Sequence, residues 1–258
     1  MAVLRKLLKY DLRANMKIYL FIWPAVILFA IIERIAISVD LDGKLGTVLV
    51  STTTTLFVLG VIAACVFALI VSVVRFYSGL LRDEGYLMFT LPVKPWQLVL
   101  SKFLTALLTC TVTIIVCGLS SWYLFDGIDG FYLLAKTILN YMRPSENLML
   151  LLVMLIVFAS LCEGLLQIYL SCAIGHLFKK HRVFWSVVIY FGISVLIEIV
   201  SVTSLVGLNL WNIFDEVTQS ATARINLVLA AVLAVQLALC TLYYFLTERI
   251  LRKNLNLE

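Results

Sequence analysis

The chain has 258 residues, of which 63% are hydrophobic and 14% charged, whereas about a quarter of the residues in an ordinary soluble domain are charged. A soluble protein of this length could not bury so much apolar surface in one core, so the composition excludes a soluble globular class and predicts lipid as the solvent. In a soluble protein the net charge of +5 would suggest nucleic-acid binding. Here the basic residues gather between apolar runs, which is typical of a membrane protein and explains the net charge better, so we expect no nucleic-acid partner.

Residues 1–17 are predicted to form an interfacial amphipathic helix that lies in the headgroup plane. At about 100° per residue, Val3, Leu4, Leu7, Leu8, Tyr10 and Leu12 share one arc, and Arg5, Lys6, Lys9, Arg13 and Lys17 share the opposite one. Each basic residue contributes about 1 kcal/mol near anionic lipid. Asp11 projects into the apolar arc. Either it sits at the helix edge in water, or it forms a salt bridge with a basic residue of the second span or of a partner.

Six apolar stretches follow, each with about the 20 residues needed to cross the hydrocarbon layer. They are Ile18–Ile37, Val48–Val74, Leu98–Phe125, Leu148–Ile174, Val183–Val206 and Ile225–Leu246. The first is expected to be a retained anchor rather than a secretory signal, because its apolar run is too long and no A-x-A site follows. The predicted fold class is therefore all-α: a polytopic integral membrane protein with a six-helix transmembrane domain over residues 18–246 and a tail over 247–258.

The Lys and Arg residues predict the orientation. Four of the 20 fall on one side of the membrane, Lys44, Lys136, Arg143 and Arg224, and Arg34 lies inside a span. The other fifteen fall on the opposite side: Arg5, Lys6, Lys9, Arg13, Lys17, Arg75, Arg82, Lys94, Lys102, Lys179, Lys180, Arg182, Arg249, Arg252 and Lys253. This positive-inside bias predicts that both termini are cytoplasmic. The two longer outer loops, 126–147 and 207–224, carry aromatic residues that we interpret as interface anchors; a substrate-handling vestibule has no motif to support it.

Polar stripes at helical spacing run along three spans. They are Thr105, Thr109 and Thr113 in the third, Ser160, Glu163, Gln167 and Ser171 in the fourth, and Ser186, Tyr190, Ser194, Glu198 and Ser201 in the fifth. Such residues most often hydrogen-bond between helices. A carboxylate near the bilayer centre is costly unless it is neutral, paired or wet, so Glu163 and Glu198 are either protonated acids or part of a translocation path or subunit interface. Ser160 and Gln167 share the face of Glu163 and favour the second interpretation there; for Glu198 both stay open.

No residue set points to catalysis. The sequence contains no H-E-x-x-H, no G-x-S-x-G and no paired intramembrane aspartates. The six cysteines have no C-x-x-C spacing and are expected to be inert thiols. Without a G-x-x-x-x-G-K-[ST] loop the chain holds no nucleotide itself. We therefore expect a non-enzymatic chain without catalytic, cofactor-binding or metal-binding residues, in which ATP could act only through a separate subunit.

The longest polar interruption between two spans runs from Arg75 to Lys102. It holds the acidic pair Asp83-Glu84, and Pro92 and Pro95 should end a short helix predicted over Ser78–Phe89. A charged amphipathic helix between two spans is well placed to meet a soluble partner.

Several groups of residues here resemble the inner-loop signature of bacterial ABC exporter permeases of the type-two class. They are Arg75-Phe76-Tyr77, Asp83-Glu84-Gly85-Tyr86-Leu87, Phe89-Thr90-Leu91-Pro92-Val93 and Ser101-Lys102. The ends of the chain, Leu7–Arg13 and Ile250–Leu257, are also similar to the ends of that family. The likeness in layout covers the whole chain, while the specific motifs cover a small part of it.

The resemblance implies a permease subunit in a bacterial plasma membrane, paired with a second copy or a sister permease. Two ATPase subunits, which carry ATP and Mg²⁺, would dock on the coupling loop over residues 75–97. Carried over residue by residue, Asp83, Glu84, Gly85, Tyr86, Leu87, Met88 and Phe89 would enter a groove on the ATPase. Apolar anchors beside an acidic pair suit a protein partner, whereas docking on lipid would favour Lys or Arg.

The alternative function is an ion-coupled secondary transporter or channel that uses Glu163 and Glu198. Inverted repeats and broken mid-membrane helices would support it, yet Pro24 is the one proline within the six spans. The exported substrate stays open under either function.

Overall fold

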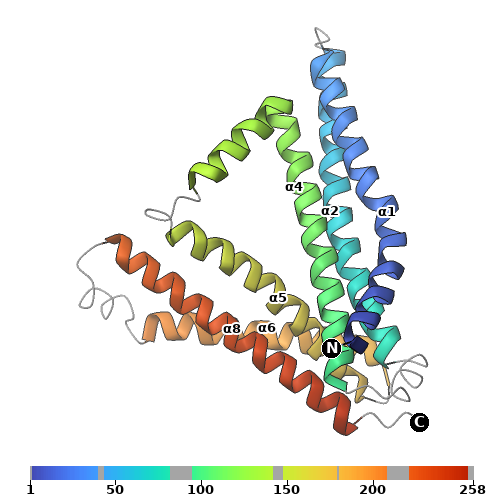
Figure 1. Cartoon of the computed structure of the whole chain (residues 1–258), viewed down its shortest axis with the longest axis vertical. Helices are drawn as coiled ribbons and strands as arrows, with labels where there is room; N and C mark the ends of the chain where they lie inside the picture. The colour runs from blue at the N-terminus through green and yellow to red at the C-terminus, as the bar shows by residue number, and fades with distance from the viewer. Residues whose placement is uncertain are drawn as a thin grey trace. The chain divides into compact units, whose positions relative to one another are not determined.

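The computed structural model describes residues 2–39, 44–81, 95–141, 148–178, 180–207 and 221–254, and every element in these ranges is an α-helix. The helices are α1 (Ala2–Ser38), α2 (Lys44–Leu81), α4 (Pro95–Tyr141), α5 (Leu148–His176), α6 (Arg182–Gly207) and α8 (Ala221–Asn254) (Figure 1). Each contains a stretch long and apolar enough to cross a membrane. The prediction of an all-α protein with six transmembrane helices is confirmed.

The predicted interfacial helix over residues 1–17 is not a separate element. Helix α1 continues from Ala2 to Ser38, because no glycine or proline interrupts the chain between the amphipathic segment and the first span. The amphipathic pattern itself is visible in the exposure of the side chains. The five basic residues are exposed while Leu7, Leu8 and Leu12 are half-buried. Tyr10, placed with the apolar arc in the sequence, is 70% exposed instead.

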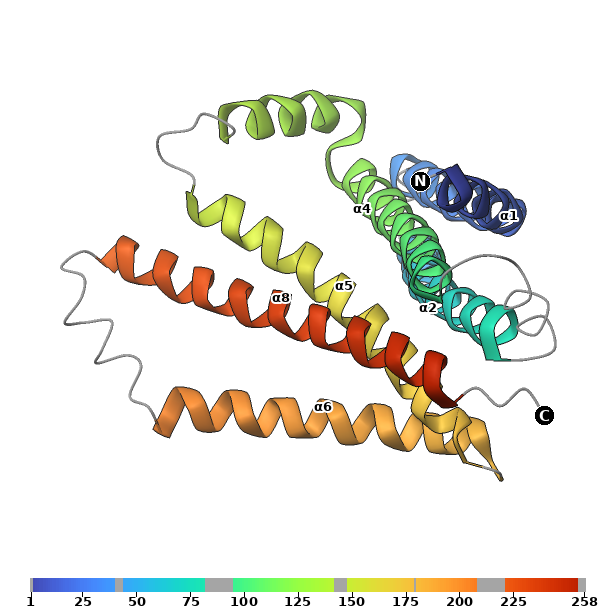
Figure 2. The ribbon, with the colours of Figure 1, turned by 60° about the horizontal axis from the view of Figure 1, so that its bottom comes forward.

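Other helix ends also differ from the predicted bounds. The expected helix over Ser78–Phe89 begins as the last residues of α2, which ends at Leu81, and residues 82–94 lie outside the described part of the chain. Helix α4 starts at Pro95, since proline suits the first helical position. It continues to Tyr141, so most of the expected outer loop 126–147 is helical. Figure 2 shows α4 bent toward its C-terminal end. The sequence of this part of the helix contains Gly127 and Gly130, and glycine weakens a helix.

The second predicted outer loop and the predicted C-terminal tail also differ from their expected bounds. The outer loop predicted over 207–224 lies between the end of α6 at Gly207 and the start of α8 at Ala221, and residues 208–220 are not described. The predicted tail over 247–258 begins as helix, because α8 extends to Asn254.

The chain divides into two compact units. The N-terminal unit consists of Met1–Arg75 and Leu100–Met142, and the C-terminal unit of Phe76–Val99 and Arg143–Glu258. The boundary passes through α2 and α4. Each of these two helices therefore has its longer part in the N-terminal unit and the end that flanks residues 82–94 in the C-terminal unit.

Side chains from α1, α2 and α4 hold the N-terminal unit together. The Tyr19 hydroxyl donates to the Ala68 carbonyl at 3.3 Å, which joins α1 to α2. The Trp23 indole donates to the Thr113 hydroxyl at 3.1 Å, which joins α1 to α4. Beside them Val26, Ala64 and Cys117, one from each helix, form a small buried core. The apolar spans thus pack by close contact supplemented with hydrogen bonds, as expected where lipid is the solvent.

In the C-terminal unit, α5 packs along both α8 and α6 (Figure 2). The approach to α6 is closest at Gly175, where an added Cβ would lie 2.7 Å from the backbone nitrogen of Ser186 and 2.8 Å from its Cα. A glycine is required here because the backbone of α6 occupies the space that a side chain would fill. The α5–α6 turn ends at His181, which adopts a left-handed φ of 53°.

Replacement of Gly175 by Ala is expected to destabilise the C-terminal unit by about 1–3 kcal/mol, the usual cost of overpacking. The added methyl group would push against the backbone of α6, which cannot rotate away as the end of a side chain can. Thermal unfolding of the purified protein in detergent measures the effect. Gly164→Ala is the matched control, because a Cβ at that position of α5 meets nothing within 4 Å. Equal melting temperatures for the two variants would contradict the close approach.

Candidate functional site

The predicted coupling residues Asp83, Glu84, Gly85, Tyr86, Leu87, Met88 and Phe89 lie outside the described residues. The structure describes the two helix ends that flank them in sequence. These are the end of α2 up to Leu81 and the start of α4 from Pro95. The geometry of these ends decides how a force applied to the segment between them would enter the protein.

The end of α2 is fixed to α5 by aromatic contacts. The ring of Phe76 stacks on that of Tyr169, with centroids 4.0 Å apart and planes 8° apart, and the two residues are 0% and 1% exposed. Tyr77 meets His176 edge-on at 6.1 Å. Leu80, one turn further on, is fully buried. Such contacts are favourable beyond the burial of area alone.

The start of α4 is fixed in the same unit. Leu98 and Val99 are 1% and 0% exposed. The hydroxyl of Tyr244 on α8 donates to the carbonyl of Trp96 at 2.9 Å. Both ends that flank residues 82–94 are therefore packed within the C-terminal unit. The sequence singled out Phe76 and Tyr77 only through the family resemblance, and it did not single out Tyr169 or Tyr244.

Arg75 acts in the N-terminal unit. Its guanidinium donates to the carbonyl of Ala14 on α1 at 3.1 Å. The three neighbouring residues of the Arg75-Phe76-Tyr77 motif thus contact different partners: the arginine holds α2 to α1, and the two aromatic residues hold α2 to α5.

Asp11 forms a salt bridge with Lys102, whose Nζ lies 2.5 Å from Oδ1; the two side chains are only 15% and 9% exposed. The Ser101 hydroxyl donates to Oδ2 at 3.5 Å. Of the two alternatives for Asp11, a paired carboxylate is the one observed. The expected partner was wrong, however, because Lys102 belongs to the third span and not to the second. The periodicity of α1 shows which face Asp11 occupies, but not that α4 covers this face.

The basic residues Arg5, Lys6, Lys9 and Arg13, on the other arc of α1 from Asp11, remain exposed. Their positions suit the predicted contact with lipid headgroups.

The polar residues of the third span are buried, and most of their hydrogen bonds stay within α4. Thr105, Thr109 and Thr113 are at most 2% exposed. Each hydroxyl donates to a carbonyl one turn earlier in α4. Of the three, Thr113 also accepts the bond from Trp23 and so joins two helices. This local pairing is how a hydroxyl is satisfied inside an apolar helix bundle.

The polar residues of the fourth span have different neighbours. The Gln167 amide donates to the Ser194 hydroxyl at 2.7 Å and to the Tyr190 carbonyl at 3.3 Å, which binds α5 to α6. Glu163 is half-buried and faces α8, within electrostatic range of Cys240 and Tyr243. Ser160 is exposed, and its hydroxyl donates to the Val157 carbonyl in its own helix. Gln167, Glu163 and Ser160 thus have different neighbours, and a translocation path or helix interface at Glu163 stays a prediction.

Glu163 nevertheless has a polar neighbour on α8 that the sequence did not indicate. The Tyr243 hydroxyl is buried and has no hydrogen-bond partner among the described residues, and it lies near enough to Glu163 for the two groups to interact electrostatically. Glu198 is exposed on α6. Across the described part of the chain no three His, Cys, Asp or Glu side chains cluster as metal ligands would, and all six cysteines are free thiols.

The residues and their contacts carry the functional argument for this protein. No protein-family model, no curated protein and no solved structure matches the chain.

Proposed function

We propose that this chain is the membrane-spanning permease subunit of an ATP-driven exporter of the bacterial plasma membrane, and that separate ATPase subunits dock on residues 82–94. The single observation that carries the proposal is that both helix ends flanking this segment are packed within the C-terminal unit. Phe76 on one side and Val99 on the other are 0% exposed. A polar segment between two such anchored ends suits the transfer of a mechanical push.

The path of that push follows from the contacts. Displacement of residues 82–94 enters α2 at Leu81 and α4 at Pro95. The Phe76–Tyr169 stack passes it to α5, and the hydrogen bond from Tyr244 to Trp96 passes it to α8. Closely packed side chains transmit strain rather than absorb it. The C-terminal unit therefore moves with residues 82–94. Helix α2 carries the same displacement past Arg75 into the N-terminal unit.

The second part of the proposal concerns partners. The chain has no phosphate-binding loop, so ATP and Mg²⁺ belong to the ATPase subunits. Large apolar side chains stay exposed along α6, with Phe184, Phe191 and Leu196 each more than 60% exposed. In a membrane protein such a face meets lipid or another apolar helix. A second copy of this chain or a sister permease would meet it in the assembled exporter.

Glu84→Ala and Tyr86→Ala test the docking assignment. Each is expected to lower recovery of ATPase activity with the tagged chain by tenfold or more, since an interface hot spot contributes about 2 kcal/mol or more. The measurement is ATP hydrolysis in chain purified from its native membrane. Lys44→Ala, an exposed residue on the predicted outer side, is the control. Unchanged association and turnover in both variants would remove the assignment.

The competing function is transport driven by an ion gradient through Glu163. The observation in its favour is the half-buried carboxylate beside the unpartnered Tyr243 hydroxyl. The purified chain alone, reconstituted without any ATPase, would then catalyse gradient-driven transport that Glu163→Gln abolishes. We expect no such transport.

A further inference from the structure

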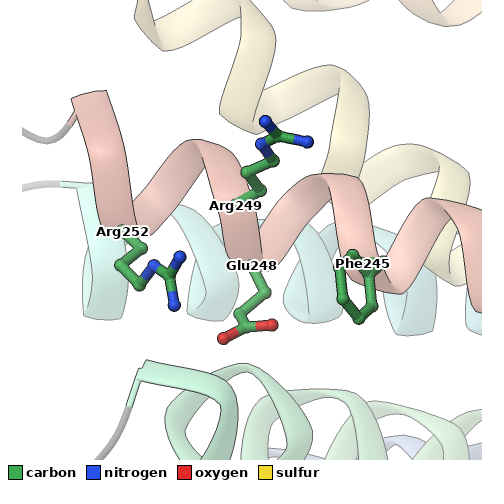
Figure 3. Close-up of a pocket in the computed structure, with 4 residues that line it drawn as sticks. All are labelled: Phe245, Glu248, Arg249 and Arg252. Atoms are coloured by element: carbon green, nitrogen blue, oxygen red, sulfur yellow. The ribbon is translucent and has the colours of Figure 1, made fainter.

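A pocket of about 330 Å³ lies at the C-terminal end of the last membrane-spanning stretch, which runs from Ile225 to Arg252. Its lining comes from Phe245, Glu248, Arg249 and Arg252 on α8 (Figure 3). Phe245 is 67% exposed, both arginines are exposed and Glu248 is half-buried. Opposite charges and an apolar ring thus meet at the end of a membrane-spanning stretch, where we expect a bilayer to change from hydrocarbon to headgroup.

The arrangement of these side chains selects among ligands. Figure 3 shows Phe245, Glu248 and Arg252 extending toward the same side of α8, with Arg249 extending the other way. Neither Glu248 nor the two arginines form an ion pair with any residue that the structure describes. The pocket therefore offers both a cationic and an anionic group to an incoming molecule, next to an apolar surface.

We propose that this pocket binds the headgroup of a zwitterionic phospholipid with a primary ammonium, the chemistry of phosphatidylethanolamine. Arg252 holds the phosphate through charge-assisted hydrogen bonds. Glu248 accepts hydrogen bonds from the ammonium, and Phe245 contacts the start of the acyl chains. This assignment goes beyond the exporter function and does not depend on it.

Other phospholipid headgroups fit less well. Phosphatidylcholine carries an ammonium without N–H donors, so it cannot hydrogen-bond to Glu248. Phosphatidylglycerol would satisfy the arginines, but its headgroup is an uncharged diol that leaves the carboxylate without a counter-charge. A soluble phosphate compound would leave Phe245 without an apolar partner.

Substitutions in the pocket should leave the fold intact. The residues that anchor this part of α8 are Thr247 and Leu251, which are 0% and 2% exposed, and they lie outside the pocket lining. Glu248→Gln and Arg252→Ala change side chains that are half-buried and exposed, respectively.

Native mass spectrometry of the delipidated full chain tests the proposal with three probes of identical acyl chains: phosphatidylethanolamine, phosphatidylcholine and phosphatidylglycerol. The wild-type chain is expected to retain the ethanolamine lipid about two- to fivefold more than the choline lipid, the range for a partly exposed ion pair. Glu248→Gln should bring this ratio close to one. Arg252→Ala should lower retention of all three lipids, whereas the control Arg5→Ala should leave the ratio unchanged.

Two outcomes would overturn the assignment. Equal retention of the ethanolamine and choline lipids by the wild-type chain would remove the role of Glu248. Preferential retention of phosphatidylglycerol, unaffected by Glu248→Gln, would identify an anionic-lipid site in place of the zwitterionic one.

Discussion

Lys102→Met is expected to destabilise the protein by about 3–5 kcal/mol, because it leaves the carboxylate of Asp11 without its partner in a poorly solvated site. The Asp11 side chain is 15% exposed, and besides Lys102 it accepts a 3.5 Å bond from the Ser101 hydroxyl. That bond is too long to replace the lost ion pair. Denaturant unfolding in detergent, followed by tryptophan fluorescence, measures the loss.

The double variant Asp11→Asn with Lys102→Met distinguishes the effect of an unpaired Asp11 charge from the general effect of replacing Lys102. With both charges removed, most of the stability should return, since no uncompensated charge remains. Lys17→Met, an exposed lysine on the same helix as Asp11, is the control and should change stability by no more than about 0.5 kcal/mol. A single variant at Lys102 as stable as the Lys17 control would show that the salt bridge does not form.

Phe76→Ala is expected to cost about 3 kcal/mol. This is the lower end of the range for a buried aromatic residue, because lipid already surrounds much of the unfolded chain. The substitution opens a cavity against the ring of Tyr169, which stacks on Phe76 at 4.0 Å. It also frees the end of α2 from α5, the contact through which the proposed push would pass. The same unfolding measurement reports the change in stability.

Phe191→Ala provides the comparison for Phe76, because Phe191 is 62% exposed on α6 and its truncation leaves no cavity. Its expected effect is within about 0.5 kcal/mol. Phe76→Leu should lose less than Phe76→Ala, since it fills part of the space. A loss at position 76 no larger than at position 191 would mean that the end of α2 is not anchored to α5.

The spans could be predicted because apolar length is a strong pattern in a membrane protein. The extent of each helix could not. Hydropathy marks where a helix leaves the hydrocarbon, whereas the helix itself ends where backbone hydrogen bonds stop. Residues 2–17 therefore form one helix, α1, with the first span. Helix α4 continues beyond Phe125 to Tyr141 despite two glycines.

The candidate site shows the same limit at the level of side chains. The sequence indicated that Asp11 and Glu163 were polar residues on apolar faces, but not which helix covers each face. Lys102 pairs with Asp11 from α4, and Tyr243 lies within electrostatic range of Glu163 from α8, although more than 75 residues separate each pair in sequence. Periodicity describes one helix at a time, and the choice of neighbour depends on packing among all six.

The most direct test of the account is photo-crosslinking from position 86, with an ultraviolet-activated amino acid in place of Tyr86 in the native membrane. The account predicts a crosslink to a polypeptide that hydrolyses ATP, and none from the same probe at Leu45, an exposed position near the start of α2 on the predicted outer side. A probe at position 86 that captures only lipid, or that reacts with a reagent confined to the outside of intact cells, would contradict an energy supply through this segment.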